Sequence, residues 1–540
     1  MTQKTQASRL DAIVIGAGFG GLYALYELRR QGFDVLLLER APGVGGTWYW
    51  NCYPGARVDV YGIEYSYSFS DEIQQEWDWS EVMPTQPELE RYLNFVTDRL
   101  DLRRDIRFST TVTAARFDEE AGVWSVEADT GERFTAQFVV AATGCLSAPL
   151  APNIRGVEAF SGDTLITSTF PREGYDFRGK RVAVVGTGSS GVQAIPIVAE
   201  QASSLHVFQR SAAFTRPAGN RPMGRDEMDA IKASYPDLRR RLAETFTGTI
   251  HVGAITVEDI PTDERILTAS PEKIRRKVAE DGWSAPWGWY DAFVDPAANK
   301  AAVALYGDLV RGVVQDPDVA ESLVPTYPLG CKRPIYDTGY FATFNRDNVT
   351  LVDLRKEPID RVTPDGIETA AQKYNFDVIV YATGFDAITG ALTRIDIRGR
   401  DDVSLKARWL DDARAYLGLQ SHGFPNLFMV NGPGSPSVHI NVVAAVEHHV
   451  QIIADLMVHM AKNDKTTVEP DVEAEIGWAE RVDSLVTGTI RASDDCNSWY
   501  LGSNVAGKRR KYLTFVGGQV AYRQACDELV NGGYIGFVFD

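Results

Sequence analysis

The sequence has 540 residues, and its 55 Lys and Arg against 73 Asp and Glu give a net charge of −18. At roughly 100–200 residues per domain the length predicts about three or four lobes, and a hydrophobic fraction of 44% argues against extended disorder. A surface this acidic repels phosphate backbones and anionic lipid headgroups, so we expect no nucleic-acid partner and no docking on a membrane.

The five cysteines are far apart in the sequence, and the closest two, Cys496 and Cys526, are 30 positions apart. This spacing contains no CxxC redox pair and no zinc-ligand pattern, and an odd, sparse set is typical of a reducing compartment. We therefore expect no disulfide framework and no metal site. The first residues lack the apolar core of a signal peptide, and no run of about 18 apolar residues occurs. The sequence predicts a soluble, cytoplasmic protein without membrane insertion.

The first predicted element is a buried strand at 11–15, followed by a GxGxxG turn and a helix that starts near Leu22. A second strand, 34–38, ends in an acid 18 residues after the last glycine. This order predicts a dinucleotide site, because the glycines permit the tight turn, the approach of a pyrophosphate and close helix packing, while the acid accepts hydrogen bonds from the adenosine ribose. Its candidate residues are Gly16, Gly18, Gly21 and Glu39.

The same pattern recurs further along the chain. A strand at 180–185 leads into GTGSSG and a helical stretch, and the next strand, 205–208, is followed by Gln and Arg instead of an acid. An acid would repel a 2′-phosphate, whereas an arginine pairs with it, so this second site predicts NADPH in preference to NADH. Its candidate residues are Gly186, Gly188, Gly191 and Arg210.

Two further apolar segments, 138–144 and 378–386, contain the same Ala-Thr-Gly triplet, where small residues let the chain pass close to a dinucleotide. The charged stretch 221–328 has helical spacing at 226–233 and 271–281 and an aromatic run, 283–290, which we interpret as an interface or a substrate-facing surface. We predict an α/β fold with two Rossmann-like dinucleotide-binding domains and a helical insertion. The domains are FAD-binding at 1–148 and 389–540, NADPH-binding at 149–220 and 329–388, and the insertion at 221–328.

Two dinucleotide sites in one chain indicate hydride transfer from a nicotinamide to a flavin. The first site, with its ribose-binding acid, fits FAD, and the second fits NADPH. Without a CxxC pair the protein is not expected to be a disulfide reductase. Oxygen, a protein acceptor or an external oxidant then remains to receive the electrons from the flavin.

The chain resembles the type I Baeyer–Villiger monooxygenases, in particular the phenylacetone and steroid monooxygenase branch. The segments that carry this resemblance span nearly the whole chain: 45–59 (GGTWYWNCYPGARVD), 67–81, 185–191, 207–211, 330–335 (GCKRPI), 381–392, 432–437 and 497–508. The resemblance implies an enzyme that reduces FAD with NADPH, captures O2 as a C4a-peroxyflavin and inserts one oxygen atom next to the carbonyl of a ketone. The product is an ester or lactone, with sulfoxidation as an expected side activity.

The resemblance also implies roles for single residues. An anionic peroxide and an anionic adduct need a cation that keeps its proton, and by match to the family motif Arg333 is that cation. Asp59 matches the carboxylate that positions it, Lys332 a contact of the nicotinamide cofactor, and Trp499 a loop tryptophan near substrate and nicotinamide. The match also places Thr47 and Trp48 along the flavin. Structural alternatives are an Arg333 that ties two domains together, a loop-capping Asp59 and a Trp499 that only packs.

The chain departs from the family at several positions. The family fingerprint, FxGxxxHxxxW followed by Pro or Asp, is altered at 160–171, where Ile166 replaces the histidine and Phe170 the tryptophan. Losing a titratable imidazole leads us to expect weaker coupling, with more NADPH spent on hydrogen peroxide. Cys52 stands where the family usually has arginine. His439, after GPGSPS, is a candidate to hydrogen-bond a polar group of the substrate, or is merely packed.

Other functions remain open at this point. The chain fits a flavin monooxygenase that oxidises nitrogen or sulfur, a poorly coupled NADPH oxidase, or a sensor that holds both cofactors without turnover. Arg333 with Asp59 favours ketone oxygenation, whereas the altered fingerprint keeps the heteroatom alternative open. The branch resemblance suggests bulky aryl, alicyclic or steroid-like ketones as the small-molecule partner, together with O2.

Overall fold

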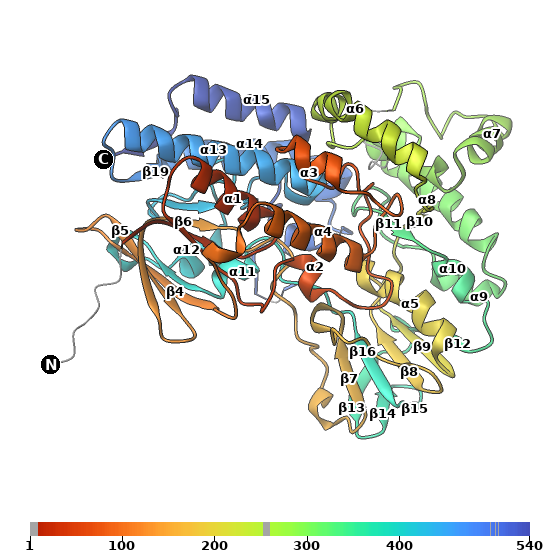
Figure 1. Ribbon diagram of the computed structural model, residues 1–540. Coiled ribbons are helices and arrows are strands. Elements are labelled where there is room, and N and C mark those ends of the chain that lie inside the picture. The colour runs from red at the N-terminus through yellow and green to blue at the C-terminus, as the bar shows by residue number, and fades with distance from the viewer. Residues whose placement is uncertain (1–8, 252–259, 497, 503, 506) are drawn as a thin grey trace.

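The computed structural model describes residues 9–251, 260–496, 498–502, 504–505 and 507–540. Within these ranges two sheets of mainly parallel strands organise the chain, and helices pack against both (Figure 1). The larger sheet lies with the C-terminal helices in the left half of Figure 1, and the second sheet lies at the lower right. The predicted α/β class is confirmed.

The larger sheet has the strand order β17-β4-β5-β6-β1-β2-β3 in the described chain, and β18 also pairs with β6. Strand β1 runs parallel to β2 and β6, and Ile13 and Val14 at its centre are fully buried. Burial on both faces explains why this strand is a continuous apolar run. The strands are β1 (Leu10–Ile15), β2 (Val35–Leu38), β3 (Ile106–Arg107), β4 (Val112–Asp118), β5 (Val123–Ala128), β6 (Arg133–Ala141), β17 (Asp396–Arg398) and β18 (Leu427–Met429).

The second sheet has the order β12-β9-β8-β16-β7, with every pairing parallel. Its strands are β7 (Asp163–Ile166), β8 (Arg181–Val185), β9 (Ser204–Gln209), β12 (Val349–Asp353) and β16 (Val378–Tyr381). Smaller sheets in the described chain pair β10 (Thr215–Pro217) with β11 (Ile335–Asp337), join β13 (Ile359–Thr363), β14 (Gly366–Thr369) and β15 (Lys373–Asn375), and pair β19 (Val468–Pro470) with β20 (Phe537–Phe539).

Helices follow the first turn of each sheet and cover the sheets. Helix α1 packs along α13, and both contribute to the largest apolar core. The helices beside the larger sheet are α1 (Phe19–Arg30), α2 (Thr47–Trp50), α3 (Asp71–Glu76), α4 (Gln86–Arg99), α11 (Gly390–Thr393), α12 (Leu405–Asp411), α13 (Val442–Lys462), α14 (Val472–Val486) and α15 (Gly518–Asn531). Those beside the second sheet are α5 (Ser189–Gln201) and α10 (Tyr340–Thr343). In the part of the chain described, no helix combines the length and apolarity needed to cross a membrane.

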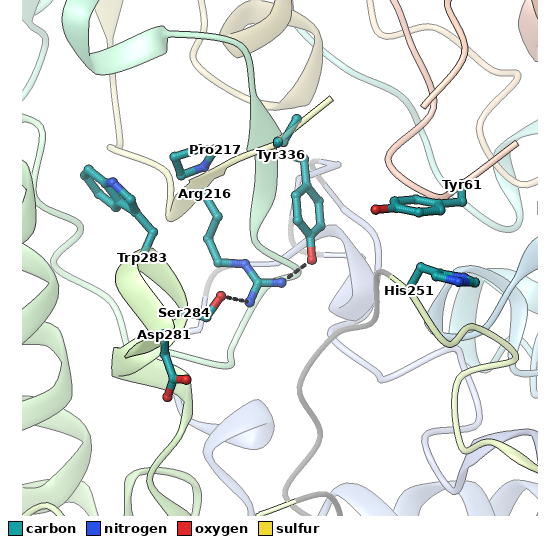
Figure 2. Close-up of a pocket in the computed structure, with 10 residues that line it drawn as sticks. Tyr61, Arg216, Pro217, His251, Asp281, Trp283, Ser284 and Tyr336 are labelled. Carbon is teal, nitrogen blue, oxygen red and sulfur yellow. Dashed lines mark hydrogen bonds between the residues drawn. The ribbon is translucent and has the colours of Figure 1, made fainter. Parts of the chain in front are cut away.

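The charged stretch after β10 is helical, as its spacing predicts. Its helices are α6 (Arg225–Glu244), α7 (Pro271–Asp281), α8 (Pro296–Arg311) and α9 (Pro317–Ser322). The aromatic run 283–290 is not the surface that we expected, because Trp287 and Trp289 are 2% and 0% exposed and belong to the core. The first tryptophan of the run, Trp283, borders a cavity of about 490 Å³ around Arg216 (Figure 2).

The expectation of no disulfide is wrong for one pair. Cys331 and Cys496 form a disulfide, with their Cα atoms 5.6 Å apart, whereas Cys52, Cys145 and Cys526 are free thiols. The two bonded residues are 165 positions apart in the sequence. Spacing rules concern local patterns and carry no information about a pair that only the fold brings together.

Candidate functional site

The first glycine-rich turn joins β1 to α1 and is too crowded for side chains. A Cβ on Gly21 would lie 1.6 Å from the carbonyl oxygen of Gly16. Gly16 has φ +102°, and a Cβ there would lie 2.7 Å from the oxygen of Ala142. A Cβ on Gly18 would touch Gly46 at 3.4 Å. The bare backbone and the N-terminus of α1 together form a place where a pyrophosphate can approach.

Glu39 lies beside this turn at the end of β2. Its side chain is 4% exposed and accepts hydrogen bonds from the backbone N–H of Ala17 at 2.5 Å and of Ala41 at 2.7 Å. Burial raises the pKa of Glu39, although both hydrogen bonds act in the opposite direction. Thr47 and Trp48 open α2, just after the glycines that face the turn. These predicted flavin contacts therefore gather at one end of the larger sheet.

The second glycine-rich turn repeats this geometry between β8 and α5. Gly186 has φ +112° with its Cβ position 2.6 Å from the oxygen of Ala382, and a Cβ on Gly191 would lie 2.2 Å from the oxygen of Gly186. Ala142 and Ala382 are the first residues of the two Ala-Thr-Gly triplets, so each triplet packs against a glycine turn. By contrast, nothing lies within 4 Å of a Cβ on Gly188.

This difference predicts opposite outcomes for two alanine substitutions in one motif. Gly191→Ala should lower the melting temperature and abolish NADPH binding, because the new methyl group collides with backbone that cannot rotate away. Gly188→Ala, the matched control, should keep the melting temperature because its Cβ points into open space. Thermal unfolding of both purified variants measures the effect. Equal melting temperatures would contradict the crowding argument.

Lys332 and Arg210 bring two positive charges together at the end of the second sheet. The Lys332 ammonium group lies over the ring of Tyr327, 4.3 Å from its centroid. Burial and the charge of Arg210 lower the pKa of Lys332 to about 8. Two cations that disfavour one another are stabilised when an anion binds both, which is the chemistry that a 2′-phosphate needs.

As a predicted contact of NADPH, Lys332 should give the binding of this cofactor a pH dependence. A bound phosphate should raise the pKa of Lys332, so the contribution of Lys332 to affinity is fully present below about pH 8 and is lost as the pH rises further. The KM for NADPH should therefore rise roughly tenfold above that pH, and the KM for NADH should not. Lys332→Met should remove the difference between the two pH profiles. A flat pH profile for NADPH in the unmodified protein would rule out this role for Lys332.

Arg333 and Asp59 form an ion pair between two segments that are far apart in the sequence. Arg333 Nε lies 3.1 Å from Asp59 Oδ2, and Arg333 Nη1 donates a hydrogen bond to the carbonyl oxygen of Val438 at 3.1 Å. The side chains of Arg333 and Asp59 are 29% and 35% exposed, so the pair is partly accessible to a ligand. The structure thus brings together the predicted cation and its predicted carboxylate.

The surroundings keep Arg333 charged. Burial alone would lower the pKa of Arg333, but Asp59 and then Tyr500 outweigh this effect and the pKa is raised. His439 lies next to Val438, and its Nε2 is 3.1 Å from the Tyr512 hydroxyl. Burial, with smaller effects from two arginines, lowers the pKa of His439 well below its usual value, so the imidazole is neutral. His439 therefore does not place a second positive charge beside Arg333.

Trp499 lies in a short 3-10 helix, η10 (Trp499–Leu501). The chain is attached to other parts of the protein before this helix, at Cys496, and after it, at Lys508. Trp499 packs with Cys145 and Ile388 in a small apolar cluster. The Cys331–Cys496 disulfide fixes the chain just before this helix, and Lys508 Nζ pairs with Asp386 Oδ1 at 2.6 Å just after it. Trp499 and Lys508 thereby contact the residues that follow the second Ala-Thr-Gly triplet.

Known proteins resemble this chain along its whole length. Residues 10–234 match the pyridine nucleotide-disulphide oxidoreductase family model. The chain is 40% identical to 2-oxo-Δ3-4,5,5-trimethylcyclopentenylacetyl-CoA monooxygenase of Pseudomonas putida, over 99% of each chain. It is 38% identical to a Baeyer–Villiger monooxygenase of Pseudooceanicola batsensis, over 99% of this chain and 97% of the relative. The chain belongs to the Baeyer–Villiger monooxygenase family. A solved structure titled as oxidised steroid monooxygenase bound to NADP aligns with a TM-score of 0.90 at 45% identity, over 98% of this chain and 99% of that one.

Membership of this family confirms the expected class of enzyme, a flavin-dependent monooxygenase with FAD and NADP as its cofactors. It also directs attention to residues near Arg333 that the sequence reasoning missed. Cys145 follows the first Ala-Thr-Gly triplet, a position that could have marked it, and burial raises the pKa of its thiol. Tyr65 and Tyr500 both lie within electrostatic reach of Arg333 and Cys145.

Gln193 is a further residue whose contacts only the structure of this Baeyer–Villiger monooxygenase reveals. It lies in α5, and its Oε1 accepts a hydrogen bond from the Tyr53 hydroxyl at 2.8 Å, while its Nε2 donates to the carbonyl oxygen of Arg57 at 3.1 Å. Gly55 lets the chains meet, since a Cβ there would lie 2.4 Å from the oxygen of Gln193. The helix of the second glycine motif is thus tied to the segment that ends in Asp59.

Proposed function

We propose that this Baeyer–Villiger monooxygenase converts a ketone, O2, NADPH and a proton into an ester or lactone, NADP+ and water, with Arg333 at the reaction centre. The pairing of Arg333 with Asp59 at 3.1 Å, in surroundings that raise the pKa of the arginine, carries the proposal. A permanently charged guanidinium can stabilise negative charge that develops beside it at any working pH.

The residues present fit both cofactors. Bare glycine turns and the buried Glu39 suit FAD in the larger sheet, and the converging Arg210 and Lys332 suit the 2′-phosphate of NADPH in the second. We accordingly assign 1–148 and 389–540 to the FAD domain, 149–220 and 329–388 to the NADPH domain, and 221–328 to a helical insertion. When bound and reduced, FAD would activate O2 for this chemistry.

The side chains of the protein then orient the reacting groups and stabilise the charge that develops on them. Asp59 holds the Arg333 guanidinium by its Nε atom, which keeps the plane of the group fixed. The neutral His439 is hydrogen-bonded to Tyr512. It lies near Arg333 without adding a second positive charge there. We assign His439 to the wall of the ketone pocket and Trp499 to the segment that covers it.

A panel of aryl, alicyclic and steroid-like ketones tests the proposal. Ketone-stimulated NADPH oxidation with an ester or lactone among the products is expected. Products oxidised only at nitrogen or sulfur would favour the heteroatom alternative. Flavin reduction without any stimulation by ketone would favour a sensor.

The altered fingerprint predicts a leak of reducing equivalents. Cys52, one departure from the family pattern, donates its thiol hydrogen to the carbonyl oxygen of Phe170, another departure, with Sγ 3.2 Å from that oxygen. The neighbouring Arg172 binds the carbonyl oxygen of Tyr49 at 2.7 Å, so this segment joins the two cofactor halves. Ile166→His with Phe170→Trp should reduce the hydrogen peroxide formed per NADPH severalfold. Unchanged leakage, measured with a peroxidase assay, would dismiss the coupling role.

A further inference from the structure

The Cys331–Cys496 disulfide joins two segments that take part in the proposed reaction centre. Cys331 directly precedes Lys332 and Arg333 in the chain, and Cys496 lies three positions before Trp499. The bond therefore connects the segment that carries the proposed cation to the segment that carries the tryptophan. Nothing in the proposed reaction uses the two sulfur atoms.

Both halves of the disulfide are buried in a small apolar cluster. Cys331 is 1% exposed and Cys496 is 0% exposed. Unbonded sulfur atoms cannot lie as close together as bonded ones, so two thiols need more room than one disulfide. In a closely packed interior this room comes from displaced neighbours. The buried neighbours, which together with the two cysteines we call the disulfide cluster, are Val486, Tyr500, Leu501, Tyr512 and Val516.

The disulfide cluster contacts groups that act on Arg333. Val438 packs against the cluster, and its carbonyl oxygen accepts a hydrogen bond from Arg333 Nη1 at 3.1 Å. Tyr500 belongs to the cluster, and its ring centroid lies 4.5 Å from that of His439. The phenol of Tyr500 also contributes to the raised pKa of Arg333. A displacement of the cluster therefore reaches the guanidinium through a hydrogen bond and through a neighbouring ring.

The structure also accommodates the reduced state. Cys496 Sγ lies 3.2 Å from the carbonyl oxygen of Cys331, so a thiol at Cys496 has a hydrogen-bond acceptor at hand. The backbone N–H of Cys496 closes a turn on the carbonyl oxygen of Ser493, and the two residues within this turn, Asp494 and Asp495, are exposed. The bond thus lies directly beneath a surface turn. A small dithiol can reach it when this turn opens locally.

We propose that the Cys331–Cys496 pair is a site of reversible reduction by dithiols, and that its redox state sets how much of the NADPH consumed yields ester. The dithiol donates two electrons and two protons, the S–S bond breaks, and two cysteine thiols and the disulfide form of the donor result. With the bond closed, Arg333 is held in place for ketone oxygenation.

With the bond open, Arg333 is displaced, and more of the NADPH is spent with O2 and a proton to give NADP+ and hydrogen peroxide. The two cysteines act through Arg333 and are positioning residues. This inference rests on the proposed function and adds a means of control to it.

The test measures ester and hydrogen peroxide formed per NADPH in the FAD-loaded enzyme before and after reduction. Dithiothreitol reduces the enzyme, thiol titration verifies that reduction is complete, and desalting removes the reagent because it would consume peroxide. We expect the ester-to-peroxide ratio to fall about tenfold, since Arg333 is displaced and not removed. Oxidised glutathione should restore the ratio. After equilibration in mixtures of reduced and oxidised dithiothreitol, the ratio should follow a two-electron curve.

Two variants complete the design. Cys331→Ser combined with Cys496→Ser cannot form the bond, so this variant should show the low ratio before any reduction and should not respond to dithiothreitol. Cys526→Ser is the matched control, because it removes a buried free thiol outside the disulfide cluster. It should respond to reduction as the unmodified enzyme does. If the doubly substituted variant fails to hold FAD, the redox titration of the unmodified enzyme decides alone.

The other outcomes overturn the proposal. A ratio that stays unchanged in fully reduced enzyme refutes it, and so does a response of the doubly substituted variant to dithiothreitol. A parallel fall of ester and peroxide, with loss of FAD, would make the bond a structural brace only. If the untreated enzyme yields ester and reduction changes nothing, this inference fails and the proposed function stands. If no ketone yields an ester in either state, the proposed function fails and this inference fails with it.

Discussion

Arg333→Ala should abolish ester formation, with a loss in kcat/KM for ketone on the order of 10³-fold. The reason is electrostatic: in the proposed mechanism, the guanidinium paired with Asp59 is the fixed positive charge that offsets negative charge at the reacting carbonyl. NADPH oxidation should continue, because this substitution leaves untouched the glycine turns and Lys332, to which we assign the binding of the dinucleotides. Gas chromatography of products and an NADPH assay on the same sample separate the two activities.

Two further variants sharpen this test. Arg333→Lys keeps the charge but loses the planar geometry that Asp59 fixes, so it should restore only a small part of the activity. Arg491→Met is the matched control, since Arg491 lies in the same electrostatic neighbourhood of Tyr500 and His439. It should keep ester formation. Lactone production that survives the loss of Arg333 would refute the proposed role.

Breaking the Cys331–Cys496 disulfide should lower the melting temperature by several degrees. The bond closes a loop of 165 residues, and the chain-entropy model gives such a closure about 5 kcal/mol of stabilisation. The loss of stability should be greatest around Trp499, because the chain on either side of it then keeps only the Lys508–Asp386 ion pair of its two attachments. Thermal scans with and without a phosphine reductant, on the unmodified enzyme and on Cys331→Ser, measure the shift.

The free cysteines supply the control. Cys526→Ser removes a buried free thiol and should leave the sensitivity to reductant intact. Titration of the denatured, unreduced protein should find three thiols, and titration after reduction should find five. Five thiols before reduction, or a melting temperature indifferent to the reductant, would contradict the assignment.

Local patterns predicted the dinucleotide turns well, because the physics that demands glycine is local. At Gly21 and at Gly191, a Cβ atom would collide with the carbonyl oxygen of the residue five positions earlier in the same turn. The pairing of Arg333 with Asp59 was also anticipated, although from the family resemblance and not from spacing. A match to a family motif can predict a contact between two residues even when 274 positions separate them in the sequence, as they do here.

What the sequence could not predict arises from contacts between distant segments. The bonded cysteines, the hydrogen bonds of Gln193 and the cavity around Arg216 each unite residues far apart in the chain, and no periodicity marks them. The aromatic run 283–290 misled for a related reason. Large apolar rings indicate burial or a binding surface equally well until the neighbouring elements are placed.

Because Gln193 anchors α5 to the stretch that leads into Asp59, hydrogen bonds connect the two proposed nucleotide sites. Occupancy of one should alter the affinity of the other, and thermodynamic reciprocity requires the same factor in both directions. The apoprotein should accordingly bind NADP+ with a different strength from the flavin-loaded form, and NADP+ should change flavin retention to the same degree. A single glutamine side chain would then help set the order in which the enzyme is assembled for turnover.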